Sequence, residues 1–150
     1  MTEWQWSAFA DLSAFDLYQV LQKRQDVFIL EQKCLYPDMD SLDQDAHHLL
    51  GWRVINGKRE LAAYVRVLAP GAKYDEMSLG RVLTAPLARG SGIGRELLAQ
   101  GIAHAERQHP GHRIRIGAQR YLEKFYAGFG FVTFSQPYDE DGIIHVDMLR

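Results

Sequence analysis

A glycine-rich turn, RGSGIGR at residues 89–95, has the residue types and spacing that suit phosphate binding. Three glycines fall within five residues, and a helix-like pattern over residues 93–108 follows directly. The first turn of a helix carries unpaired backbone N–H groups and a partial positive charge. Without side chains in the way, an anion can approach those groups closely. With Arg89 and Arg95 at its ends, the turn predicts an anion-binding site, because a connection that binds nothing needs fewer glycines.

Two common phosphate-binding motifs do not fit this turn. The dinucleotide fingerprint G-x-G-x-x-G needs its third glycine where the sequence has Arg95, or Leu97 if the count begins at Gly92. The P-loop, G-x-x-x-x-G-K followed by Ser or Thr, also needs a glycine at Arg95 when counted from Gly90. A domain that binds a nucleotide or another phosphorylated ligand is therefore a disfavoured interpretation.

The pattern R-x-x-G-x-G does fit, with Arg89, Gly92 and Gly94 standing between a predicted strand and a predicted helix. This arrangement resembles motif A of the GNAT superfamily, whose members transfer acyl groups from acetyl-CoA. The downstream stretch AQRYLEKFYAGFGF, at residues 118–131, resembles the second signature of the same superfamily. Together the two motifs, at this separation, are far more specific than the glycine turn alone.

Two further stretches, residues 27–49 and 141–148, resemble the ElaA-type branch of that superfamily. The resemblance covers essentially the whole chain and implies one domain, residues 1–150, with an α+β GNAT fold. Its central sheet is expected to be mixed, mostly antiparallel and flanked by helices. The strand before the turn is expected to bulge and to separate from its neighbour, which admits pantetheine. The residues that the resemblance assigns to acetyl-CoA are Val82, Leu83, Thr84, Arg89, Gly90, Ser91, Gly92, Ile93, Gly94, Arg95 and Gln119.

One tyrosine, Tyr126, matches the family residue that protonates the thiolate of coenzyme A. A phenol with a pKa near 10 is a plausible acid for a thiolate whose thiol has a pKa of about 8.5. The structural alternative is that Tyr126 only packs its helix. A backbone N–H group of the strand 79–84 is the expected donor to the oxyanion. Gln119 departs from the family pattern, because many members have an asparagine there.

The general base cannot be identified from the sequence. The candidates at strand or helix ends are Glu31, Glu76, His47, His48 and His145. We prefer the pair Glu31 and His48, because the segment between them is the least core-like part of the chain. Water is a further proton acceptor if the pKa of the amine is already lowered.

Neither a metal nor a covalent intermediate is expected. The six histidines form no H-x-x-x-H pair on a helix. Cys34, the single cysteine, has no histidine and acid at a recognisable spacing, and free cysteines are usually small buried apolar groups.

Apolar periodicity and turn residues predict the elements that position these side chains. A helix begins at Ser13, which forms a capping box with Asp16, and Asn56-Gly57 predicts a hairpin turn. Gly130 suits the position after a helix end. The predicted strands cover residues 4–8, 48–55, 61–68, 77–84, 113–118, 131–134 and 143–149, and the predicted helices cover 14–31, 93–108 and 121–129. A polar loop is expected to join the last two strands.

Composition limits the class of protein. A net charge of −2 lacks the basic excess of nucleic-acid-binding domains. No apolar run approaches the length of a membrane span, and the N-terminus has no signal-like apolar core. With a single cysteine, these features predict a cytoplasmic protein without a nucleic-acid or membrane partner.

The sequence therefore predicts an N-acetyltransferase in which an amine of a small molecule or peptide attacks acetyl-CoA directly, in a ternary complex. The alternative is a non-catalytic acyl-CoA-binding or regulatory module. The acidic loop, residues 38–45, suggests a cationic acceptor such as a polyamine, an aminoglycoside or a lysine side chain, or it is simply solvated. A homodimer paired near residues 143–149 is a further option.

Overall fold

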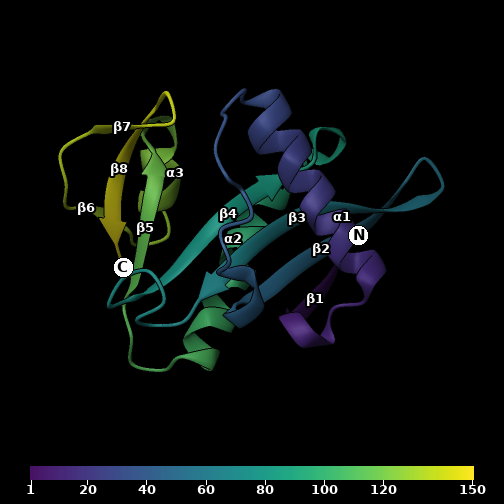
Figure 1. Cartoon of the computed structure of the whole chain (residues 1–150), viewed down its shortest axis with the longest axis horizontal. Helices are drawn as coiled ribbons and strands as arrows, with labels where there is room; N and C mark the ends of the chain where they lie inside the picture. Colours follow the sequence, from purple (N-terminus) through teal and green to yellow (C-terminus); the bar gives the residue numbers. More distant parts are fainter.

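One mixed sheet organises the computed structural model, which describes all residues from Met1 to Arg150 (Figure 1). The strands follow the order β1-β2-β3-β4-β5-β8-β6, and β7 pairs with β8. Only β4 and β5 run parallel; all other neighbours are antiparallel. The strands are β1 (Glu3–Ala8), β2 (His47–Ile55), β3 (Lys58–Leu68), β4 (Met77–Thr84), β5 (Ile114–Gln119), β6 (Val132–Thr133), β7 (Tyr138–Glu140) and β8 (Ile143–Leu149).

Helices cover both faces of this sheet, with α1 on one face and α2 on the other (Figure 1). The Ser13 hydroxyl caps α1 by accepting a hydrogen bond from the Asp16 amide at 3.0 Å. The helices are α1 (Ala14–Arg24), its π-helical continuation Gln25–Glu31, α2 (Ile93–Gln108) and α3 (Glu123–Ala127), with 3₁₀ turns at Phe9–Asp11, Asp43–Asp45, Pro86–Ala88 and Arg120–Leu122. None of the helices has the length and apolar character needed to cross a membrane.

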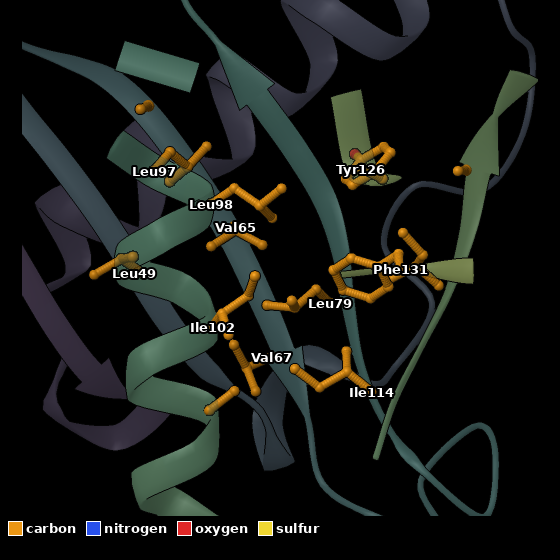
Figure 2. Packing of buried hydrophobic residues seen from close by; sticks show 14 of the residues in the cluster. Leu49, Val65, Val67, Leu79, Leu97, Leu98, Ile102, Ile114, Tyr126 and Phe131 are labelled. Atoms are coloured by element: carbon orange, nitrogen blue, oxygen red, sulfur yellow. The ribbon is translucent and has the colours of Figure 1, made fainter. Parts of the chain in front are cut away.

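The larger core lies between α2 and the sheet. Figure 2 shows Leu98 and Ile102 of α2 directed at Val65 and Val67 of β3. A close approach at Gly101 fixes the helix against the strand, because a Cβ added there would lie 3.2 Å from Cγ1 of Val65. Each fully buried aliphatic side chain of this kind contributes about 1.5–3 kcal/mol of hydrophobic stabilisation.

Two irregularities open the sheet at β4. The β3–β4 register shifts between Tyr64 and Arg66, and opposite this shift Arg81 adopts a positive φ of 53°. An extra residue in one strand bends that strand and increases its twist. The parallel β4–β5 ladder contains only two pairs and ends at Ser78 and Arg115. Beyond that point the strands diverge (Figure 1), as the sequence resemblance implied.

The C-terminal third differs in detail from the sequence prediction. The expected polar loop contains a strand, β7, which forms a hairpin with β8 through Asp141 and Gly142, at φ 53° and 83°. The strand expected at residues 131–134 shortens to β6, and the helix expected at 121–129 shortens to a 3₁₀ turn and α3. An Asp-Gly pair between alternating residues is a strong hairpin signal, so β7 could have been found.

Candidate functional site

A cleft of about 790 Å³ occupies the place where β4 and β5 separate. Its walls come from β4 between Ser78 and Thr84, from the end of β3, from β5, α3, β7 and β8, and from the segment that follows α1. Because the ladder ends at Ser78, the backbone of the following β4 residues borders this cleft on the side where a neighbouring strand would otherwise pair. Sequence-distant elements thus meet around one open slot in the sheet.

The glycine turn contributes Arg89 and Gly94 to the lining of this cleft. Gly90 and Gly92 both adopt left-handed conformations, at φ 80° and 81°, and a Cβ on either would meet nothing within 4 Å. Gly92 is the N-cap of α2 and provides no side-chain cap. The first N–H groups of α2 are therefore left without a side-chain partner beside an open approach, which is the arrangement that binds anions.

The predicted coenzyme residues divide into two groups. Those that line the cleft are Val82, Leu83, Thr84, Arg89, Gly94 and Gln119. Those that lie outside its lining are Gly90, Ser91, Gly92, Ile93 and Arg95. In the second group Ile93 is buried in the core, and the Ser91 hydroxyl donates to the carbonyl of Ala88 at 2.6 Å. Only backbone groups of Ile93 are thus available to a ligand.

Arg89 and Glu31, two of the predicted site residues, bind each other. Both terminal nitrogens of the Arg89 guanidinium donate to the Glu31 carboxylate at 2.7 Å, and one of them also donates to the Thr84 carbonyl at 3.0 Å. The hydrogen bond from Arg89 lowers the pKa of Glu31. The donors of the Arg89 guanidinium are therefore occupied by the Glu31 carboxylate at the mouth of the cleft.

His48 does not join Glu31, contrary to the pairing that we expected. Its side chain is fully buried, and it does not line the cleft. Its ring nitrogens lie 2.6 Å from the Tyr64 hydroxyl and 2.9 Å from the Asp43 carbonyl. The segment before it looked poor in apolar residues, yet β2 places His48 inside the protein. Burial lowers the pKa of His48 and so favours its neutral form.

This burial predicts a pH-dependent stability. An unfolded histidine binds a proton below a pKa of about 6.5, whereas folded His48 resists it, so the free energy of unfolding falls as the pH drops through that value. The contribution is at most about 1.4 kcal/mol per pH unit. We expect His48→Gln to show a shallower loss than the wild type in urea unfolding between pH 7.5 and 5. Parallel pH profiles for the two proteins would contradict this assignment.

The acidic loop is an internal ion-pair network rather than a solvated segment. Asp43 accepts hydrogen bonds from Arg24 at 2.7 Å and from Arg66 at 3.0 Å, and both guanidiniums are almost fully buried. Asp38 pairs with Arg24 and also, through its other oxygen, with Arg81, at 2.8 Å each. These carboxylates are already neutralised.

A sequence signal for this network existed, because Arg24 lies in the apolar stripe of its helix. A buried guanidinium there requires carboxylate partners. Asp40, which pairs with Arg66 at 2.8 Å, also lines the cleft. The loop therefore fixes one wall of the cleft, and its charge is not free for a cationic acceptor.

Tyr126 lies on the α3 wall of the cleft. It is 6 % exposed, and its ring packs edge-on against Phe131, with centroids 6.0 Å apart (Figure 2). It also belongs to the core cluster that contains Ile116 and Ala118 of β5. Burial raises the pKa of Tyr126 to about 12. The phenol is therefore protonated throughout the physiological pH range.

The remaining base and nucleophile candidates lie in different places. His47 stacks on Trp6 at 5.1 Å, and neither it nor Glu76 lines the cleft. Cys34 lines the cleft but is buried, with its sulfur 3.3 Å from the Asp141 carbonyl oxygen. His145 also lines the cleft, from β8. Of the histidines named as candidates, only His145 lines the cleft.

Comparisons with known proteins agree with this fold. Residues 22–150 match the family model described as "Acetyltransferase (GNAT) domain". The UPF0039 protein sll0451 of Synechocystis is 42 % identical over 97 % of this chain and 93 % of its own length. Protein ElaA of Escherichia coli is 37 % identical over 100 % of this chain and 97 % of its own.

Solved structures give the same result. The structure of an acyl-CoA N-acyltransferase from Pseudomonas aeruginosa superposes with a TM-score of 0.93 and 38 % identity, covering 100 % of this chain and 99 % of the other. That of Escherichia coli ElaA superposes with a TM-score of 0.91, with the same coverage. The chain therefore belongs to the GNAT acetyltransferase family and is close to the ElaA and UPF0039 proteins over its full length.

Proposed function

We propose that the protein is an N-acetyltransferase that transfers the acetyl group of acetyl-CoA directly to a primary amine of a small molecule or peptide. One observation carries this proposal: a single cleft is bordered by Arg89 and Gly94 of the glycine turn, by the separated strands β4 and β5, and by the buried phenol of Tyr126. These are the parts that an acyl-CoA-dependent transfer requires.

In this proposal the pyrophosphate of acetyl-CoA binds the N–H groups of Gly92 to Arg95 at the uncapped start of α2. Arg89 leaves Glu31 and adds positive charge. Pantetheine lies in the slot between β4 and β5, beside Gln119, which lines the cleft and donates to Gln32 at 3.2 Å. A β4 backbone N–H group near the bulge at Arg81 donates to the thioester oxygen as it becomes negative.

The chemical step places an acid at the leaving group. The amine nitrogen attacks the thioester carbon, the tetrahedral intermediate collapses, and the carbon–sulfur bond breaks. Tyr126 donates its hydroxyl proton toward the departing sulfur. A phenol with a pKa of about 12 is a weaker acid than a thiol in water, but burial also disfavours a bare thiolate, which raises the pKa of the thiol in the cleft.

The direct test measures the release of free coenzyme A when the protein is given acetyl-CoA and an amine. The panel of amines consists of spermidine, kanamycin and a peptide with one unacetylated lysine. Amine-dependent release, with intersecting initial-rate lines for the two substrates, supports the proposal. Parallel lines would indicate a covalent acetyl-enzyme instead. Binding of acetyl-CoA without turnover of any of these amines would favour the non-catalytic acyl-CoA-binding module.

The ion pair at the cleft mouth gives a further prediction. Glu31 competes with the pyrophosphate for Arg89, so we expect Glu31→Gln to bind acetyl-CoA more tightly. The pair is exposed, and pairs of this kind are worth less than about 1 kcal/mol, so the dissociation constant should fall by about two- to fivefold. Isothermal titration calorimetry measures the change.

The matched control is Glu60→Gln, which removes the ion pair between Glu60 and Lys23 on β3 and α1, away from the cleft. Its dissociation constant for acetyl-CoA should equal that of the wild type. Weaker binding by Glu31→Gln would mean that Glu31 helps to hold the coenzyme. The cytoplasmic location and a homodimer stay predictions. The pairing of two copies through residues 143–149 was wrong, because β8 is bonded to β5 on one side and to β6 and β7 on the other and offers no free edge.

A further inference from the structure

His145 lines the same cleft as Tyr126, but from a different element, the strand β8. It lies on β8 directly opposite Gln119 of β5 and is 8 % exposed. Its Nδ1 is 2.7 Å from the carbonyl oxygen of Ile143. A carbonyl only accepts, so Nδ1 carries the hydrogen. In the neutral ring Nε2 therefore holds the free lone pair.

His145 and Tyr126 border the cleft from opposite faces of the sheet. Successive side chains of a strand alternate between faces. Tyr126 packs with Ile116 and Ala118, which point to the face covered by α2 and α3. Gln119, and with it the paired His145, points to the other face. A thioester held in the cleft would thus have the phenol on one face of the sheet and the imidazole, one strand beyond β5, on the other face.

Neighbouring side chains hold the imidazole in place. The ring of Tyr138 stacks on it with centroids 6.0 Å apart, and the Tyr138 hydroxyl donates to Asp147 at 2.6 Å. Arg115 of β5 pairs with the other oxygen of Asp147 at 2.9 Å. The Tyr138 phenol is therefore held neutral, because burial and its hydrogen bond to Asp147 raise its pKa.

Glu140 is the one charged group in direct reach of the ring. Its carboxylate oxygen lies 3.5 Å from Nε2, and its side chain is 53 % exposed at the rim of the cleft. The other titratable groups lining the cleft nearby are Cys34 and Asp141 from the adjoining loops and Lys73 and Tyr74 from the β3–β4 connection. A proton that arrives on Nε2 thus has an acceptor that leads to solvent.

We propose that His145 is the general base for the acceptor amine, which enters on the face of the sheet opposite α3. This inference rests on the proposed acetyl transfer and names the residue that the sequence left open. As the amine nitrogen bonds to the thioester carbon, Nε2 removes one N–H proton. The carbon–sulfur bond breaks, and the sulfur receives the proton of Tyr126. His145 then passes its proton through Glu140 to water, and water restores the phenol.

Two substitutions separate a base from a structural group. His145→Asn places an amide near Nδ1 and keeps a donor for the Ile143 carbonyl, but it has no basic nitrogen. We expect its kcat, with the best amine of the panel, to fall about 100-fold or more, as loss of a general base does. The acidic limb of its kcat–pH profile should disappear. The acetyl-CoA dissociation constant and the thermal midpoint should stay close to those of the wild type.

Glu140→Gln supplies a second readout on a half-exposed residue that can change without unfolding the protein. The substitution removes the carboxylate that lies 3.5 Å from Nε2 and would accept its proton, so we expect kcat to fall while the acetyl-CoA dissociation constant stays that of the wild type. His112→Asn is the control, because His112 is exposed and lies outside the cleft. Its kcat and pH profile should match those of the wild type.

The outcomes are distinguishable from failure of the proposed function. A wild-type protein that turns over none of the amines overturns the acetyl transfer and this inference with it. A wild type that is active, combined with His145→Asn that keeps both its kcat and its acidic limb, overturns the inference alone. A kcat that is unchanged in Glu140→Gln contradicts the proton route through that carboxylate.

Discussion

We expect Asp43→Ala to lower the free energy of unfolding by about 3–5 kcal/mol, the usual cost of removing one partner from a buried ion pair. Asp43 is 7 % exposed and lies between Arg24 and Arg66, which are 0 % and 1 % exposed. Without its carboxylate, the network keeps three guanidiniums against two carboxylates, and one positive charge stays buried without compensation. For a domain of this size the thermal midpoint should fall by roughly 6–20 °C.

Asp45→Ala is the matched control, because Asp45 lies in the same 3₁₀ turn but is exposed and forms no ion pair. Its free energy of unfolding should change by less than about 0.5 kcal/mol. Urea titration at pH 7 gives both values. Equal midpoints for the two variants would contradict the role given to Asp43.

The same network predicts a second loss of stability in acid. Burial opposes ionisation of Asp43, but the hydrogen bonds from Arg24 and Arg66 outweigh it and lower the pKa of that carboxyl. A lowered folded pKa stabilises the protein above the unfolded pKa near 3.9, and this contribution is lost as the pH falls further. The loss of stability that Asp43 causes in acid therefore occurs at a lower pH than the loss that His48 causes.

The second large effect concerns Tyr126→Phe, for which we expect kcat to fall about 100-fold or more while acetyl-CoA binding is unchanged. General acids contribute factors of this size, and the substitution removes only a hydroxyl from a ring that stays packed against Phe131. The pKa of about 12 also predicts that the phenol causes no basic limb in kcat below about pH 10. Steady-state kinetics with the best amine of the panel measures both.

Tyr18→Phe controls for the loss of a phenol as such, because Tyr18 is 67 % exposed on α1 and lies outside the cleft. Its kcat should equal that of the wild type. A Tyr126→Phe variant with unchanged kcat would remove the acid role and leave Tyr126 as a packing residue.

The regular elements were predictable because short-range patterns determine them. Both β4 and α2 have the predicted bounds, Met77–Thr84 and Ile93–Gln108. In each case an apolar periodicity runs until a breaker, Pro86 after the strand and Pro110 after the helix, ends it. The position of the glycine turn between them followed from the same local signals.

The polar arrangement was not predictable in the same way, because its partners are far apart in sequence. Arg89 meets Glu31 across 58 positions, and Arg66 meets Asp43 across 23. A charge has no periodicity that points to its partner, so the acidic loop read as solvated or as a substrate contact. The predicted pairing of His48 with Glu31 was wrong for a related reason. The burial of His48 is determined by its own strand, β2, and not by the polar loop before it.

The central claim is that the glycine turn and the slot beside it bind acetyl-CoA. A thermal-shift titration of the wild type with acetyl-CoA, and separately with ATP, tests it, with Arg89→Glu as the site variant and Arg107→Glu, exposed near the end of α2, as the control. Ligand at 100 times its dissociation constant should add about 2.7 kcal/mol, or several degrees. We expect this rise with acetyl-CoA but not with ATP, in the wild type and Arg107→Glu only. The absence of any rise with acetyl-CoA would contradict the account.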